Sequence, residues 1–212
     1  MTHAYFPRFS PEELRAHQEA GLRWTVAHAY NGNERYRKRL QDSGVTPEAI
    51  RGLDDLRHLP VTTVDDLRAE YPLPLLSVPE DEVVRVHASS GTTGKRKILA
   101  YTQKDIETWK SMMARCFALA GLTPRDRVQI AVGYGLWTAG VGFQLGCEHF
   151  GAMALPIGPG NLDIHLQFLL DMQSTCLCST ASMALLLAEE VEKQRLQDRI
   201  HLKRIIFGAE PH

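Results

Sequence analysis

Short apolar runs alternate with longer stretches of helical periodicity from residue 128 to residue 207. This alternation predicts strands connected by helices, and such strands run parallel in one sheet with both faces covered. We therefore expect an α/β fold, with a mostly parallel sheet and helices on both faces. Strands are expected at 128–132, 153–156, 176–179 and 205–207, and helices at 140–151, 161–172 and 182–197.

The first 75 residues have a helical pattern instead. Ser10 precedes Pro11 and two glutamates, which is typical of a helix start with a capping hydroxyl and acids at the positive end of the dipole. Further helices are expected at 35–40, from Thr46, and from a Thr62 or Thr63 cap through Leu67. We expect a helical N-terminal segment, residues 1–75, ahead of an α/β subdomain, residues 76–212.

The composition excludes several classes of protein. A net charge of -1 gives no electrostatic footprint for nucleic acid. No apolar run reaches membrane-spanning length, and the N-terminus lacks a signal-peptide pattern, so we expect a cytoplasmic protein. No metal site is expected, because Cys176 and Cys178 share one face of a strand without a second ligand pair. Core packing is expected for all four cysteines, Cys116, Cys147, Cys176 and Cys178.

The loop 89–97 carries the strongest chemical signal. Hydroxyl-bearing residues and glycines run directly into Lys95, Arg96 and Lys97. Backbone N–H groups, hydroxyls and cations in this pattern favour a polyphosphate ligand. The flanking runs 83–87 and 98–101 predict two strands in a hairpin-like unit. The alternative interpretation is an exposed polar turn with a solvated charge run.

Three familiar loop motifs do not fit. The Walker pattern requires glycine where Ser89 stands and Ser or Thr where Arg96 follows Lys95. The dinucleotide fingerprint at Gly133 has Thr138 in place of its third glycine. A nucleophile elbow is absent around Ser89, although the paired serines leave an amidase-like hydrolase as a distant alternative.

Three segments carry a family resemblance. They are the stretch 87–95 around Ser-Gly-Thr-Thr-Gly, the stretch 133–140 with the sequence Gly-Tyr-Gly-Leu-Trp-Thr-Ala-Gly, and 207–211 with Phe-Gly-Ala-Glu-Pro. Together they resemble the phenylacetate–CoA ligase family of the adenylate-forming acyl-CoA synthetases. The chain departs from that family at Arg96, where Pro is usual, at Trp137, where Phe is usual, and at His212, where an aromatic residue is usual.

The resemblance implies a two-step reaction on a small aromatic carboxylic acid such as phenylacetate. The acid is activated with ATP and Mg²⁺ as an acyl-adenylate and then transferred to coenzyme A. It assigns ATP phosphate binding to Ser89, Ser90, Gly91, Thr92, Thr93, Gly94, Lys95 and Lys97. It assigns the acyl pocket to Tyr134, Gly135, Trp137 and Thr138, and adenine binding to Gly208, Ala209, Glu210 and Pro211. Packing of Trp137 in the core is the alternative for that residue.

The family's catalytic lysine and metal-binding acid map beyond residue 212, so no catalytic residue is assigned. We expect a truncated N-terminal domain of an adenylate-forming ligase, incomplete at its C-terminus and with little activity alone. The alternatives are a non-catalytic ATP-binding module and a structural or interaction domain derived from such a ligase. A homodimer is compatible with the open sheet edge expected near Phe207.

Overall fold

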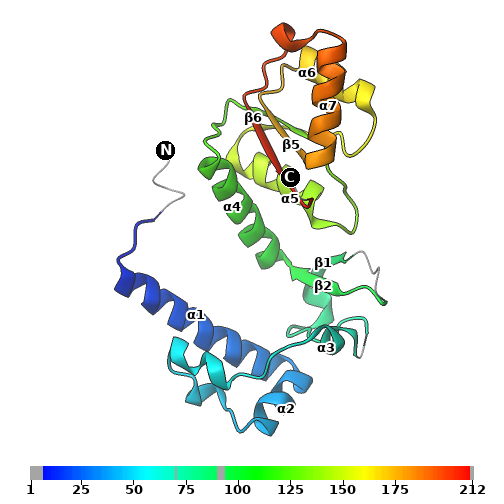
Figure 1. Ribbon diagram of the computed structural model, residues 1–212. Helices are drawn as coiled ribbons and strands as arrows, with labels where there is room; N and C mark the ends of the chain where they lie inside the picture. Colours follow the sequence, from blue (N-terminus) through cyan, green and yellow to red (C-terminus); the bar gives the residue numbers. More distant parts are fainter. Residues whose placement is uncertain (1–6, 70, 90–93, 211–212) are drawn as a thin grey trace. The chain divides into compact units, whose positions relative to one another are not determined.

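A computed structural model describes residues 7–69, 71–89 and 94–210 of the chain. These residues form two compact units, Pro7–Gln103 and Lys104–His212, which we call the N-terminal unit and the sheet unit. Figure 1 shows the elements of both units along the sequence. The domain division expected at residue 75 stays a prediction.

The N-terminal unit begins with a helical part, in which α1 (Pro11–Gly32), α2 (Glu34–Asp42) and the segment that follows α2 form a small apolar core. Ser10 caps the first helix as expected: its hydroxyl accepts from the Glu13 amide, and the Glu13 carboxylate accepts from the Ser10 amide. Val26, Leu40, Val45 and Ile50 form the buried core. The unit also contains helix α3 (Val64–Arg68) and 3-10 helices at Pro47–Ala49, Leu53–His58 and Glu80–Glu82.

The prediction of a helix that begins at Thr46 is wrong in its length. The chain makes only the single 3-10 turn Pro47–Ala49, and Thr46 forms no side-chain cap. Ile50 is already extended, and its side chain is buried in the core. Burial of Ile50 therefore ends the turn before a helix can form.

The N-terminal unit ends with a hairpin, as the sequence predicts. Strands β1 (Val83–Ala88) and β2 (Ile98–Thr102) pair antiparallel, with Ala88 opposite Ile98. The phosphate-loop candidate is thus the connection between two paired strands.

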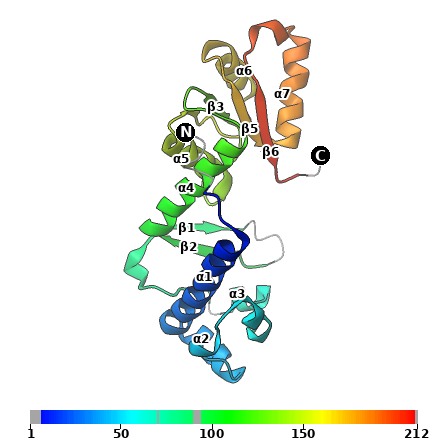
Figure 2. The ribbon, with the colours of Figure 1, turned by 90° about the vertical axis from the view of Figure 1, so that its left-hand side faces the viewer.

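The sheet unit confirms the predicted parallel α/β architecture. Its four strands lie in the order β4-β3-β5-β6 and all pair parallel. Figure 2 shows β3, β5 and β6 side by side, with α7 alongside them. The strands are β3 (Arg127–Ile130), β4 (Met153–Leu155), β5 (Cys176–Thr180) and β6 (Arg204–Gly208). The helices are α4 (Gln103–Leu119), α5 (Thr138–Phe150), α6 (Leu162–Asp171), α7 (Ala181–Lys193) and the 3-10 helix Gln197–Arg199.

Two apolar clusters cover the two faces of this sheet. Residues of α4 and α5 pack on one face with Cys176 and Cys178, while residues of α6 and α7 pack on the other with Leu177. The two cysteines therefore share a face, as expected for alternate strand positions. Core packing is confirmed for Cys147, Cys176 and Cys178. It is wrong for Cys116, which is exposed because it lies off the buried stripe of α4.

The close contact between α4 and α5 predicts that a larger residue at Gly146 would destabilise the fold. A Cβ atom added at Gly146 would lie 2.2 Å from the Cβ of Met113 and 3.2 Å from its backbone carbon. We expect Gly146→Ala to lower the free energy of unfolding by about 1–3 kcal/mol, since the two helices must separate. Urea denaturation measures this change.

Gly21 in α1 is the matched control. A Cβ atom there meets nothing within 4 Å, so Gly21→Ala should raise the free energy of unfolding by about 0.5–1 kcal/mol through helix propensity alone. A Gly146→Ala variant as stable as the original chain would contradict the close contact of α4 and α5.

Candidate functional site

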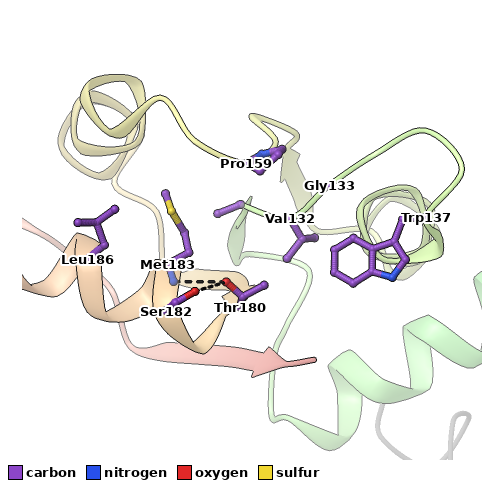
Figure 3. Close-up of a pocket in the computed structure, with 9 residues that line it drawn as sticks. Val132, Gly133, Trp137, Pro159, Thr180, Ser182, Met183 and Leu186 are labelled. Carbon is purple, nitrogen blue, oxygen red and sulfur yellow. Dashed lines mark hydrogen bonds between the residues drawn. The ribbon is translucent and has the colours of Figure 1, made fainter. Parts of the chain in front are cut away.

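A cavity of about 450 Å³ lies at the carboxyl ends of β3 and β5. Open α/β sheets bind their ligands at this edge. Figure 3 shows side chains from the loop after β3, the turn after β4 and the start of α7 around this space. Most of the lining is apolar, and its side-chain polar groups are the hydroxyls of Thr180 and Ser182 and the indole N–H of Trp137. The lining residues are Ala131, Val132, Gly133, Trp137, Pro159, Thr180, Ser182, Met183 and Leu186.

Trp137 forms one wall of the cavity. Its indole is 41% exposed and packs over Gly133, where an added Cβ atom would lie 3.2 Å from the ring. Of the four residues predicted for an acyl pocket, Trp137 is the one that lines this cavity. Gly135 is exposed with a φ of 81°, and Thr138 begins α5.

Tyr134 packs next to the cavity wall rather than in it. Its ring lies against Gly140, where an added Cβ atom would come within 2.7 Å of it. Burial, followed by the nearby Glu148 carboxylate, raises the pKa of Tyr134 to about 12. The phenol therefore stays protonated at neutral pH. Its buried oxygen has no hydrogen-bond partner among the described residues.

The segment after β6 docks on the start of α7. The Glu210 carboxylate accepts from the Ser182 amide at 2.8 Å and from its hydroxyl at 2.9 Å. These hydrogen bonds hold the pKa of Glu210 below its usual range. Because Ser182 also lines the cavity, the structure brings Gly208, Ala209 and Glu210 to the cavity's edge. Pro211 lies outside the described residues.

A buried polar network supports the Pro159 side of the cavity. The ring nitrogen Nε2 of His165 lies 2.9 Å from the Gly158 carbonyl oxygen, and Nδ1 lies 2.9 Å from the amide nitrogen of Gln129. Ser174 donates to Gln129 at 2.7 Å. These contacts assign the Nε2–H tautomer to His165, which donates to the Gly158 carbonyl. The network thus fixes the turn that carries Pro159.

The predicted phosphate loop lies in the N-terminal unit. The Ser89 amide donates to the Lys97 carbonyl, and the Lys97 amide donates to the Ser89 hydroxyl, both at 3.0 Å. Arg96 donates to the Ser89 carbonyl at 3.1 Å. Gly94 has a φ of 128°, a region that favours glycine, and Lys95 is exposed. Ser90, Gly91, Thr92 and Thr93 lie outside the described residues.

Sequence analysis missed the part of the cavity that comes from α7 and from Pro159. Thr180 is the last residue of β5, and Ser182 and Met183 follow it closely, so the rule that ligands bind beyond the carboxyl ends of parallel strands could have located them. The turn at Pro159 carried no such signal, because its position depends on the contacts of His165.

Comparison with characterised proteins places these features in context. A scan of family models finds no match. The chain is 43% identical over 204 residues to a phenylacetate–coenzyme A ligase of Escherichia coli, a match that covers 95% of this chain and 47% of the relative. Enzymes of the same name from Pseudomonas putida and Thermus thermophilus are 41% and 40% identical. The chain is related to the phenylacetate–CoA ligases. It spans about half the length of these relatives.

Solved structures confirm the adenylate-forming ligase fold. A 2-hydroxyisobutyryl-CoA ligase in complex with 2-HIB-AMP and CoA superimposes with a TM-score of 0.87 at 26% identity. The match covers 96% of this chain and 49% of that ligase. The same ligase in its thioester-forming state gives a TM-score of 0.87 at 28% identity.

The buried network predicts a pH dependence of stability. Burial lowers the pKa of His165 in the folded chain, whereas a histidine in the unfolded chain has a pKa of about 6.5. The unfolded chain therefore takes up this proton first as the pH falls. The stability contributed by neutral His165 is complete above about pH 6.5 and is lost progressively below it.

Thermal denaturation between pH 7.5 and 5.5 tests this expectation. The melting temperature of the original chain should fall over this range, and His165→Gln should fall less steeply while being less stable at pH 7.5. Parallel pH curves for the two chains would show that His165 does not contribute.

Proposed function

We propose that this chain is the phosphate- and acid-binding part of an AMP-forming acid–CoA ligase that activates an aromatic carboxylate. The apolar cavity at the carboxyl edge of the sheet, with Trp137 as a wall, is the observation that carries the proposal. The kinship to phenylacetate–CoA ligases supports it over nearly the whole chain.

The cavity favours the apolar part of a small, flat acid. An aromatic ring can stack against the indole of Trp137 and contact Val132, Met183 and Leu186. The lining offers no cation for the substrate carboxylate, so we infer that the carboxylate lies at the mouth of the cavity. Tyr134, Gly135 and Thr138 support the Trp137 wall in this proposal.

The phosphates of ATP are proposed to bind at the hairpin loop. Loop 89–94 would supply hydroxyls and backbone N–H groups, and Lys95 and Lys97 would stabilise the departing pyrophosphate. The residues from Gly208 to Pro211 would line the adenine, with Glu210 oriented by Ser182. Carboxylate attack then gives the acyl-adenylate and pyrophosphate, and the thiol of CoA attacks the acyl carbon to release AMP.

Mg²⁺ enters this proposal only as the counter-ion of ATP. Among the described residues there is no group of three His, Cys, Asp or Glu side chains arranged to hold a metal ion.

The location of the protein in the cell and its oligomeric state are also proposed. No described helix has both the length and the apolar character required to cross a bilayer. We propose a cytoplasmic enzyme that acts without nucleic acid, since the chain has near-neutral charge and four free cysteines. The exposed Ile205 and Phe207 on β6 favour a homodimer, which analytical ultracentrifugation can test.

Acid-dependent exchange of pyrophosphate into ATP tests the ligase proposal on the whole gene product. Arylacetic and benzoic acids should support exchange better than long-chain fatty acids, and CoA should then give the thioester. ATP binding without exchange would instead favour the non-catalytic nucleotide-binding module. Absence of ATP binding by calorimetry would leave a structural or interaction domain.

Trp137 should set the affinity for the acid. Removing the ring in Trp137→Ala should raise the KM for an arylacetic acid about tenfold or more, and leave the KM for ATP unchanged, because an aromatic contact is lost. Trp137→Phe should retain most of the affinity. Trp24→Ala, at an exposed tryptophan of α1, is the matched control. Equal changes in both KM values would contradict a wall that contacts the acid alone.

A further inference from the structure

The cationic end of the phosphate loop is held partly by its own hairpin. Hydrogen bonds with Ser89 fix the Arg96 guanidinium and the Lys97 amide. Lys95 is held differently: its ammonium group lies 5.2 Å from the ring centroid of Tyr71, within cation–π range. The Lys95 ammonium group therefore lies over the Tyr71 ring.

Arg68 lies next to the same part of the loop. The central carbon of its guanidinium group is 3.7 Å from the position that a Cβ atom on Gly94 would occupy. The Arg68 side chain is only 27% exposed. It forms an ion pair with Asp65 in which the charged atoms are 4.0 Å apart. Arg68 thus places a guanidinium group next to Gly94, the residue that precedes Lys95.

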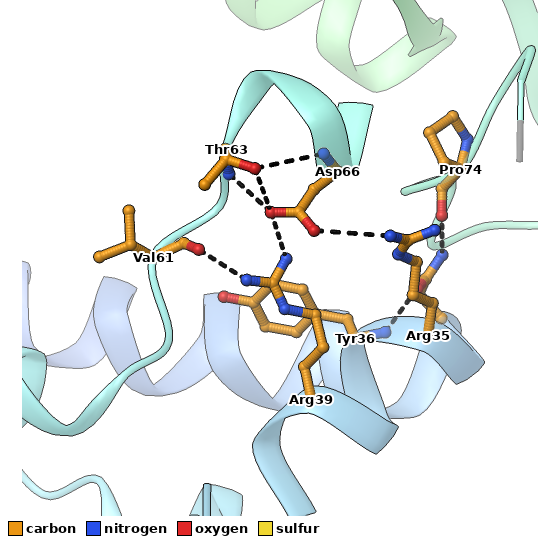
Figure 4. Close-up of polar contacts among 8 residues, drawn as sticks. Arg35, Tyr36, Arg39, Val61, Thr63, Asp66 and Pro74 are labelled. Carbon is orange, nitrogen blue, oxygen red and sulfur yellow. Dashed lines mark hydrogen bonds and ion pairs between the residues drawn. The ribbon is translucent and has the colours of Figure 1, made fainter. Parts of the chain in front are cut away.

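The helix that carries Arg68 is fixed on α2 by Asp66. The Asp66 carboxylate accepts from the Thr63 amide at 2.7 Å and from its hydroxyl at 2.8 Å, which closes a capping box at the start of α3. It also forms ion pairs with Arg39 at 2.9 Å and Arg35 at 3.5 Å (Figure 4). The hydrogen bonds with Thr63 are the largest cause that lowers the pKa of Asp66 to about 2. At neutral pH Asp66 is therefore ionised and α3 is anchored.

We propose that Arg68 and Tyr71 form a second side of the phosphate site, in which Tyr71 positions Lys95 and Arg68 supplies a further cation to the phosphates of a nucleoside triphosphate. This inference rests on the proposed function, since it assumes that the loop binds ATP. It assigns a direct part in phosphate binding to the last residue of α3, and a positioning role to Tyr71 in the segment that follows. That segment precedes the hairpin in sequence and carries none of the residues predicted for the site.

The positioning role of Tyr71 is tested with variants made in the presence and in the absence of the Lys95 ammonium group. MgATP affinity, measured by titration calorimetry on the whole gene product, should fall about two- to fivefold in Tyr71→Leu, because leucine lacks the ring that attracts the ammonium. Tyr71→Phe should bind as the original chain does. In a Lys95→Met background, Tyr71→Leu should have no further effect, whereas a purely structural role would lower affinity in both backgrounds.

The matched control for Tyr71 is Tyr30, whose ring lies 5.7 Å from the Arg37 guanidinium within the helical part of the same unit. Tyr30→Leu removes a comparable cation–π pair and should leave MgATP affinity unchanged. A loss of affinity equal to that of Tyr71→Leu would show that the effect is one of general stability, and would overturn the positioning role.

The role of Arg68 is tested by removing its charge and by measuring MgATP affinity at different salt concentrations. Arg68→Gln should weaken MgATP binding about fivefold to tenfold at low ionic strength and make the affinity less dependent on salt, since one cation is lost. Arg68→Lys should restore most of the affinity. The control is Arg57→Gln, at an exposed arginine of the 3-10 helix Leu53–His58.

The outcomes separate the two proposals. If the original chain does not bind MgATP, the proposed function fails. If it binds, and Arg68→Gln and Tyr71→Leu bind equally well, the second side of the phosphate site is wrong while the ligase proposal stands. If thermal melting shows that Arg68→Gln is unfolded, the Tyr71 and Lys95 double-variant cycle still decides.

Discussion

The close approach of α5 to its neighbours is the contact on which the sheet unit and its cavity both depend. A Cβ atom on Gly140 would lie 2.6 Å from the Gly133 carbonyl oxygen, and one on Gly142 would lie 2.8 Å from the Trp109 ring. Glycine at these positions lets the loop after β3 fold back, so that the Gly140 amide donates to the Gly133 carbonyl at 3.0 Å. This return of the chain places Trp137 at the cavity. Opposite faces of α5 therefore control its packing against α4 and the shape of the site.

Much of the fold followed from local sequence patterns, because the elements concerned are determined by nearby residues. The strand–helix alternation predicted the parallel sheet, Ser10 predicted the start of α1, and the runs around the Ser/Thr/Gly loop predicted the hairpin. Each of these signals comes from periodicity or capping within a few residues. The expected parallel sheet also correctly placed Cys176 and Cys178 on one face.

The remaining features depend on contacts between distant residues. The turn at Pro159 is fixed by the His165 network, whose members lie on β3, on α6 and just before β5. The short turn after Thr46 ends where Ile50 enters a core formed with Val26 and Leu40. A local sequence pattern cannot predict contacts between residues that are far apart in the chain. For the same reason, the proximity of Arg68 to Gly94 could be found only once the chain was folded.

The chain after β6 has a strained conformation that is held by hydrogen bonds beside the cavity. Ala209 has a φ of 71°, a left-handed conformation that costs a non-glycine residue about 1–3 kcal/mol. Two hydrogen bonds from Ser182 to the next residue, Glu210, offset this cost and fix the segment beside the cavity. Strain of this kind persists where surrounding contacts over-determine the backbone, and such places are often ligand sites. A segment already ordered in this way loses little further entropy when a nucleotide binds against it. Strain at Ala209 and the anchor at Ser182 therefore both support the proposed nucleotide site at this edge of the sheet.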